Sequence, residues 1–198
     1  MTALATPPSP LMSVDEFLAW PGDGIGTIFD LVDGRIRAQE VPSDACGTIH
    51  SNVASTVANH LRNKSLRSRA IIHGGIRPNL RADWNYRIPD IVVTCTPNEQ
   101  GMRDVPNPKL IIELLSPTNK TDTWDNVRNY VTLPSVEEIV LIETTRAEAS
   151  ILRRSAEGQW PKNPLDIDRA GPIPLASIAL EITMADVYWG THVAGRIG

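Results

Sequence analysis

The segment RIPDIVVTCTPNEQGMRDVPNPKLIIELLSP, Arg87–Pro117, contains the two stretches around which this chain is built. IVVTC and LIIELL are apolar runs of strand length, and near-continuous apolar runs are typical of strands buried on both faces of a sheet. Each run carries a carboxylate, Asp90 directly before the first and Glu113 within the second. An unpaired buried charge costs several kcal/mol. A metal ion held between the two carboxylates is the leading way to offset that cost.

Length and composition limit the class of protein. The chain has 198 residues, 41% of them hydrophobic and 21% charged, which is typical of a globular domain with a real core. We expect a flexible lead over residues 1–12 and a single domain over 13–198. The net charge of -4 argues against binding to nucleic acid through bulk charge alone, although a local basic face is compatible with it.

No segment suggests a membrane or secreted protein. No apolar run approaches the roughly 18 residues of a membrane-spanning helix, and the start MTALATPPSPLMS has no basic region followed by an apolar core. The two cysteines, Cys46 and Cys95, have no metal-ligand spacing. Scarce cysteine suits a reducing compartment, so we expect a cytoplasmic protein.

The rest of the chain predicts helices interleaved with strands and hairpins. A capping box at Ser13 and Glu16 predicts a helix over 14–20, and Asp33-Gly34 between two short apolar segments predicts a hairpin. Apolar spacing predicts helices over 47–64 and 121–136, the second capped by Thr121 or Asp122. Further strands are predicted in 69–80, 137–144, 148–154 and 175–183, followed by a helical turn capped by Thr183. This order indicates an α/β (α+β) fold, one mixed sheet flanked by helices, with additional hairpins.

A third carboxylate, Asp30, lies in the first strand of the predicted hairpin. Carboxylate oxygens are ligands that suit Mg²⁺ or Mn²⁺. A bound ion of this kind activates water and offsets charge that develops on a phosphate. Hydrolysis of phosphodiester bonds is therefore the natural reaction for a site made from Asp90, Glu113 and Asp30.

This order of motifs resembles the PD-(D/E)XK nucleases, the restriction-endonuclease-like superfamily, and within it the bacterial Uma-two family of endonucleases. The matching pieces are FDLVDG at 29–34, His50 ahead of a helix, PDIVV at 89–93, IELLSP at 112–117 and the helix that ends at Tyr130. The resemblance covers roughly residues 13–190. It implies a restriction-endonuclease-like core with a divalent metal bound at Asp90 and Glu113. The family's first-hairpin carboxylate, usually Glu, maps to Asp30, which has a shorter reach.

The lysine of the superfamily's motif is missing. Two residues after Glu113 the chain has Leu115, and the helix position where this family often carries a lysine is Asn126. Lys120 or Arg128 could reach back toward Glu113 and steady the scissile phosphate. A site without the lysine is compatible with slow hydrolysis and with a protein that binds DNA without cutting it.

A basic segment over residues 62–87 precedes Asp90. It contains seven cations and one acid, Asp83, and the cations are Arg62, Lys64, Arg67, Arg69, Arg77, Arg81 and Arg87. Because phosphate neutralisation supplies most of the affinity for DNA, we expect this segment, excluding Arg81 and together with His50, to contact the DNA backbone.

Plainer interpretations stay open. Asp90 could cap a turn, Glu113 could pair with an arginine, Asp30 could be partly exposed and His50 could be a packing residue; the cations could form a solvated surface. The leading hypothesis is a metal-dependent endonuclease acting on DNA, and double-strand cleavage would favour a homodimer. The alternatives are a nucleic-acid-binding protein that no longer cuts, and a structural or partner-binding domain.

Overall fold

The computed structural model describes residues 11–64 and 67–196. Most of the predicted lead therefore lies outside the described residues. The last residue of the predicted lead, Met12, is described. It is buried in a small cluster with Phe17 and Tyr86, so ordered packing begins before residue 13. Within the described ranges, no helix has the length and hydrophobicity to span a bilayer.

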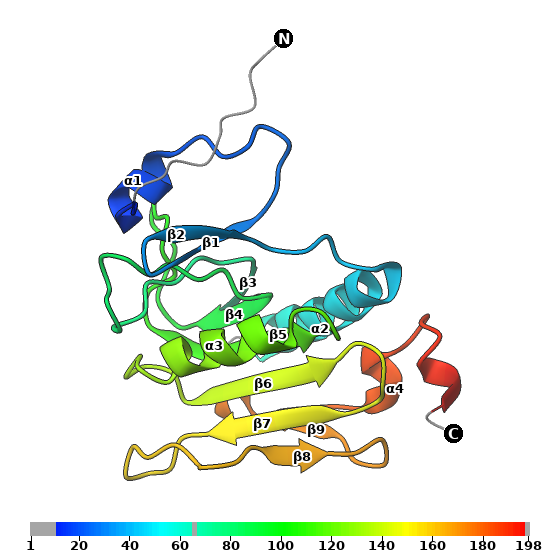
Figure 1. The fold of residues 1–198 in the computed structure, drawn as a ribbon. Helices are drawn as coiled ribbons and strands as arrows, with labels where there is room; N and C mark the ends of the chain where they lie inside the picture. The colour runs from blue at the N-terminus through cyan, green and yellow to red at the C-terminus, as the bar shows by residue number, and fades with distance from the viewer. Residues whose placement is uncertain (1–10, 65–66, 197–198) are drawn as a thin grey trace.

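A six-stranded mixed sheet forms the centre of the molecule, as predicted (Figure 1). Its strands, in spatial order, are β3 (Arg69–Ile72), β4 (Ile91–Thr94), β5 (Pro108–Leu115), β6 (Glu138–Glu143), β7 (Ala149–Arg153) and β8 (Leu165–Ile167). All neighbours are antiparallel except β5 and β6, which are parallel. A parallel pair needs a crossover connection, and helix α3 (Lys120–Tyr130) provides it.

Helices cover both faces of this sheet, which explains the apolar runs (Figure 1). Alternate residues of β4 and β5, such as Ile91 and Ile112, pack with α2 (Asp44–Asn63). The residues between them, such as Val92 and Ile111, pack in a second cluster with Val127 of α3. Because neither face is solvated, β4 and β5 have almost no polar positions.

Smaller elements surround the sheet. The hairpin β1 (Phe29–Val32) and β2 (Arg35–Ala38) lies above it, next to α1 (Val14–Ala19), and both the hairpin and the capping box of α1 confirm the predictions. The C-terminal part contains β9 (Ile173–Leu175), the 3₁₀ turn η1 (Ala176–Ile178), β10 (Leu180–Ile182), α4 (Met184–Val187) and η2 (Ala194–Arg196). β9 pairs with β10 as a separate hairpin.

Several predicted boundaries were wrong. Helix α2 begins at Asp44, because Ser43 caps it by accepting a hydrogen bond from the backbone N–H of Cys46. Helix α3 begins after Asn119 and ends at Tyr130, and neither Thr121 nor Asp122 is its cap. The predicted strand over 175–183 is interrupted by η1, and β8 and β9 had no clear signal in the sequence.

The strand predicted over 69–80 stops at Ile72, because the chain bends at Gly74 and Gly75. Gly75 lies against the ring of Tyr86, so closely that a Cβ atom there would be 2.0 Å from the Tyr86 hydroxyl oxygen. The bend returns the chain to Arg87, which pairs with Ile76. The segment that follows leads directly into Asp90 and β4.

Candidate active site

Asp90 and Glu113 meet at the end of the sheet where β4 begins and β5 ends. Ile91 pairs with Ile112, so one step further along the antiparallel ladder Asp90 lies opposite Glu113. The backbone N–H of Asp90 donates to Glu113 Oε2 at 3.4 Å, and the N–H of Leu114 donates to Asp90 Oδ2 at 2.7 Å. The structure thus brings these two predicted site residues together.

Glu113 is buried without a cationic partner. Its side chain lies on the face covered by α3, where the Tyr130 hydroxyl donates to Oε1 at 2.5 Å. Among the ion pairs of the described part of the chain, none involves Glu113, so the interpretation as a buried Glu paired with an arginine does not hold. Burial raises the pKa of Glu113 well above its usual range, and the nearby charge of Asp90 raises it further.

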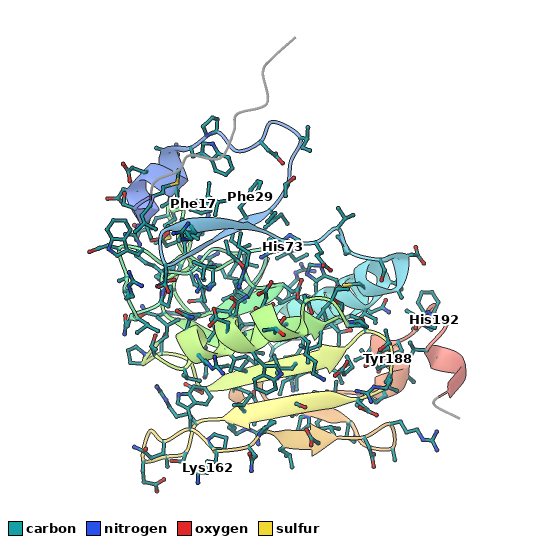
Figure 2. The ribbon with its side chains drawn as sticks, in the orientation of Figure 1. Phe17, Phe29, His73, Lys162, Tyr188 and His192 are labelled. Carbon is teal, nitrogen blue, oxygen red and sulfur yellow. The ribbon has the colours of Figure 1, made fainter. Side chains whose placement is uncertain are left out.

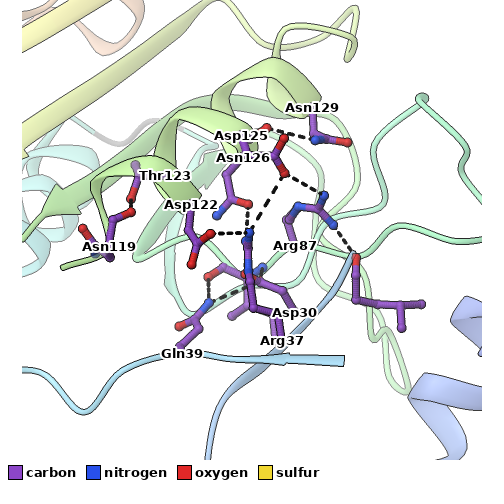
Figure 3. Close-up of polar contacts among 12 residues, drawn as sticks. Asp30, Arg37, Gln39, Arg87, Asn119, Asp122, Thr123, Asp125, Asn126 and Asn129 are labelled. Atoms are coloured by element: carbon purple, nitrogen blue, oxygen red, sulfur yellow. Dashed lines mark hydrogen bonds and ion pairs between the residues drawn. The ribbon is translucent and has the colours of Figure 1, made fainter. Parts of the chain in front are cut away.

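Asp30 faces the same cleft but is already fully engaged, as Figure 3 shows. Arg37 Nη2 donates to Asp30 Oδ2 at 2.7 Å, while Oδ1 accepts from the N–H of Ile88 at 2.8 Å and from Gln39 Nε2 at 3.2 Å. Asp30 is also 1% exposed, so the interpretation as a partly exposed strand residue was wrong. These contacts favour a structural ion pair over the predicted third metal ligand.

Arg37 is one of two residues at this site that were not predicted from the sequence. Its Nη2 also donates to Asn126 Oδ1 at 2.6 Å, and its Nη1 lies 3.3 Å from Asp122 Oδ1 (Figure 3). A cation therefore contacts Asn126, the helix position at which the resemblance described above leads one to expect a lysine. The sequence could have predicted the contact between Asp30 and Arg37, because the two residues are cross-strand partners once Asp33-Gly34 is taken as the turn of the hairpin.

The two cations predicted to replace the lysine do not contact Glu113. Lys120 Nζ lies 3.3 Å from Glu143 Oε1, at the end of β6 next to the cleft. Arg128 is exposed on α3 and is not among the described residues that line the cleft. Leu115 is buried in the apolar cluster beneath α3, so its position also supplies no polar group.

The predicted DNA-contacting cations do not form one face around the cleft. Arg69 pairs with Thr94, at the end of β3 and β4 remote from Asp90. At about 1.5 Å per residue, Arg62 lies roughly 18 Å along α2 from His50, and Lys64 and Arg67 follow it. These four cations are therefore at the opposite end of the sheet, which the linear sequence could not reveal.

The remaining cations of that segment are occupied by acids or buried. Arg77 lies 3.4 Å from both Asp15 and Asp104, and Arg81 lies 3.0 Å from Asp33. Arg87 is only 1% exposed; its Nη1 donates to the carbonyl of Leu31 and its Nη2 lies 3.6 Å from Asp125. A buried guanidinium cannot reach a DNA backbone, so Arg87 holds the hairpin to the sheet and to α3 instead.

Two histidines flank Asp90 on its other side. His50 Nε2 lies 3.0 Å from the carbonyl oxygen of Asp90, and His73 Nε2 lies 4.0 Å from Asp90 Oδ1. Burial lowers the pKa of His73, and His50 lowers it further. His73 did not stand out in the sequence, because it follows a strand without a recognisable motif.

A cleft of about 710 Å³ lies between the hairpin, α2 and α3, and its lining includes Asp30, Arg37, His50, His73, Asp90 and Glu113. Its described lining includes five carboxylates, those of Asp30, Glu40, Asp90, Glu113 and Asp122, but Arg37 as its one arginine or lysine. A cleft with more acidic than basic side chains attracts cations. A polyanionic substrate would therefore need a bound cation in this cleft.

The family model described as "Uma2: Putative restriction endonuclease" matches residues 14–185. The chain belongs to this family. A relative, the uncharacterised protein slr1290 of Synechocystis sp., is 25% identical over 185 residues, which are 92% of this chain and 94% of the relative. The crystal structure of a "putative nuclease belonging to DUF820" from Anabaena variabilis matches with a TM-score of 0.72 at 20% identity, covering 89% of this chain and 97% of that one. The Uma2 family member described here therefore has the fold of a nuclease-like enzyme.

Proposed function

We propose that this protein is a metal-dependent endonuclease that hydrolyses phosphodiester bonds in DNA at the cleft beside Asp90 and Glu113. The observation that carries the proposal is the pairing of these carboxylates, one of them buried without a cation, in a cleft rich in acids. Membership of the Uma2 family supports a nucleic acid substrate.

The donor atoms at this site suit a hard divalent cation. Asp90 Oδ2 accepts from the N–H of Leu114 and Glu113 Oε1 from Tyr130, while Glu113 Oε2 has only the long 3.4 Å contact with the N–H of Asp90, so Asp90 Oδ1 and Glu113 Oε2 would hold Mg²⁺ or Mn²⁺. When bound, such an ion supplies Lewis acidity that stabilises charge on a phosphate and lowers the pKa of a water molecule.

The chain's own residues hold this site in place. Tyr130 and the backbone N–H of Leu114 fix the two carboxylates, each from a different element. Arg37 holds Asp30 and Asn126 together. It is therefore a positioning residue for the wall of the cleft that faces Asp90 and Glu113. Lys120, whose side chain is about half exposed beside Glu143, would contact a substrate phosphate at the rim of the cleft.

Nicking of supercoiled plasmid with Mn²⁺ or Mg²⁺ tests the proposal. We expect Asp90→Asn and Glu113→Gln each to lower the nicking rate about 100-fold or more, because each removes a charged ligand. Glu137→Gln is the matched control, since Glu137 is an exposed glutamate at the far end of β5 that pairs with Lys109. Equal nicking by all four proteins would contradict the proposed site.

A nucleic-acid-binding protein that no longer cuts is the second candidate. The observation that favours it is the missing lysine, with Leu115 buried and Asn126 bound to Arg37. Binding without nicking, weakening steeply with salt, would identify this function. Absence of binding at low salt would instead indicate a structural or partner-binding domain.

The proposed centre cuts one strand, so double-strand cleavage would use two copies of the chain. Conversion of supercoiled plasmid directly to linear DNA, together with a dimer in analytical ultracentrifugation, is the expected result for a homodimeric enzyme. Accumulation of nicked circles by a monomer would indicate single-strand cleavage.

A further inference from the structure

Two imidazoles and one carboxylate converge at the side of the cleft next to α2. His50 comes from α2, His73 from the turn after β3, and Asp90 from the start of β4. One ligand atom of each lies within 4.8 Å of those of the other two. No other group of three or more such side chains reaches this proximity within residues 11–64 and 67–196.

The backbone at Asp90 holds both histidines. Its carbonyl oxygen accepts from the backbone N–H of His73 at 3.0 Å and lies 3.0 Å from Nε2 of His50. With Nε2 as the donor, the lone pair of the His50 ring is on Nδ1. Histidines that bind metals commonly donate their second ring N–H to a carbonyl or carboxylate, which fixes the tautomer and the orientation of the ring.

His73 has an unusual backbone conformation. Its φ of 50° lies in the left-handed region, which residues other than glycine seldom adopt. Such conformations cost free energy and cluster at functional sites, where the surrounding structure fixes a side chain in place. Here the conformation places the His73 ring 5.1 Å from the ring of His50, centroid to centroid, in the cleft below the hairpin (Figure 2).

The spacing of these groups is that of ligands and not of hydrogen-bond partners. His73 Nε2 and Asp90 Oδ1 are 4.0 Å apart, too far for a hydrogen bond. Two ligands on a tetrahedral zinc, each about 2.0–2.1 Å from the metal, are roughly 3.4 Å apart. Small side-chain rotations would close the remaining difference.

We propose that His50, His73 and Asp90 form a second metal site, which binds a divalent transition metal of the Zn²⁺ and Co²⁺ class in preference to Mg²⁺. Imidazole nitrogen favours zinc, cobalt and nickel, whereas Mg²⁺ takes oxygen ligands. Three protein ligands leave an open position, as in catalytic zinc sites. Asp90 belongs both to this site and to the oxygen site with Glu113, so the two metals would be neighbours.

Titration of the metal-free protein with Co²⁺, followed by visible ligand-field absorption, tests this site without DNA. We expect one Co²⁺ per chain with nitrogen coordination, displaced by Zn²⁺ and retained in a 100-fold excess of Mg²⁺. His50→Ala and His73→Asn should each weaken Co²⁺ binding about tenfold or more. Asparagine at 73 tolerates the left-handed backbone, and thermal melting checks that each variant is folded.

Two controls separate this proposal from the nuclease function. His192 also lines the cleft but lies well away from His73 in Figure 2, so His192→Asn should bind Co²⁺ like the original protein. Glu113→Gln should lose nicking but keep Co²⁺ binding within about threefold, because Glu113 is not a ligand of this site. Co²⁺ binding that Mg²⁺ displaces equally, or that survives both histidine substitutions, would overturn the inference whatever the result of the nicking assay.

Discussion

The contribution of Glu113 to the free energy of unfolding depends on pH, because its pKa in the folded protein is raised. For a raised pKa, the contribution is fully present below the unfolded-state value of about 4.3 and is lost as the pH rises through the folded value. We therefore expect the free energy of unfolding of the metal-free protein to fall over the pH range above about 4.3, and Glu113→Gln to reduce that fall. Urea unfolding across this range measures it.

Glu137→Gln serves as the control for that measurement, since Glu137 is exposed and paired at the surface. A slope with pH that is equal in the original protein and both variants would show that Glu113 does not carry the effect. Added Mg²⁺ should restore stability at the upper end of the range, because an ion that binds only the folded state stabilises it by mass action.

Cys46 lines the cleft, and burial raises its pKa to about 11, with the charge of Asp90 as the second cause. Only the thiolate reacts with alkylating agents. At about pH 8 we expect Cys46 to react roughly 100-fold more slowly than a thiol with a pKa near 9, and its rate to rise with pH up to about 11. Mass spectrometry after timed iodoacetamide treatment distinguishes it from exposed Cys95, and equal rates for the two would contradict this.

Arg37 joins two elements, because its guanidinium contacts Asp30 of β1 and Asn126 of α3. Arg37→Ala leaves the buried Asp30 carboxylate without its cation, so we expect a loss of about 2–4 kcal/mol in the free energy of unfolding. Arg35→Ala removes an exposed cation from the same strand and should cost less than about 0.5 kcal/mol. Similar losses in both variants by urea unfolding would show that the contact does not stabilise the hairpin against α3.

The elements with strong local signals were predictable. The Asp-Gly turn, the capping box at Ser13 and the apolar stripe of α2 each depend on residues close together in sequence. The start of α3 was not, because its N-cap Asn119 makes no side-chain capping bond. Its end at Tyr130 agrees with the family resemblance, although apolar spacing alone extended the helix to 136. Strand β8 is three residues long and largely exposed, so no hydrophobic pattern could reveal it.

At the scale of the whole molecule, one buried carboxylate joins the central sheet to the C-terminal part. Glu138 of β6 is completely buried and accepts hydrogen bonds from Arg153 of β7 and from Ser177 of η1. Glu138→Ala removes the shared acceptor of these donors, although Arg153 Nη2 still donates to the carbonyl of Pro174, and we expect it to lower the free energy of unfolding by about 1–3 kcal/mol. Glu137→Ala, one residue earlier and exposed, should cost less than about 1 kcal/mol, and equal losses in urea unfolding would contradict this role.

The tertiary arrangement explains which site residues the sequence could reveal. Asp90 and Glu113 were evident because a carboxylate in an apolar run is unusual wherever the strand goes. Whether the cations of the basic segment lie free at the cleft depended on strand direction and on ion-pair partners distant in sequence, such as Asp104 for Arg77 and Asp125 for Arg87. His73 depended on a turn that brings it back to Asp90.

The contact between Gly75 and Tyr86 limits which sequences can encode this protein. Any side chain at 75 would collide with Tyr86, whose ring packs on Phe17 and whose hydroxyl donates to the carbonyl of Arg103. Gly47 has open space around it, with nothing within 4 Å of an added Cβ. In a saturation library selected for folded protein, position 75 would keep only glycine, whereas position 47 would accept many residues. Divergence of this chain is thus restricted at a position that does not line the cleft.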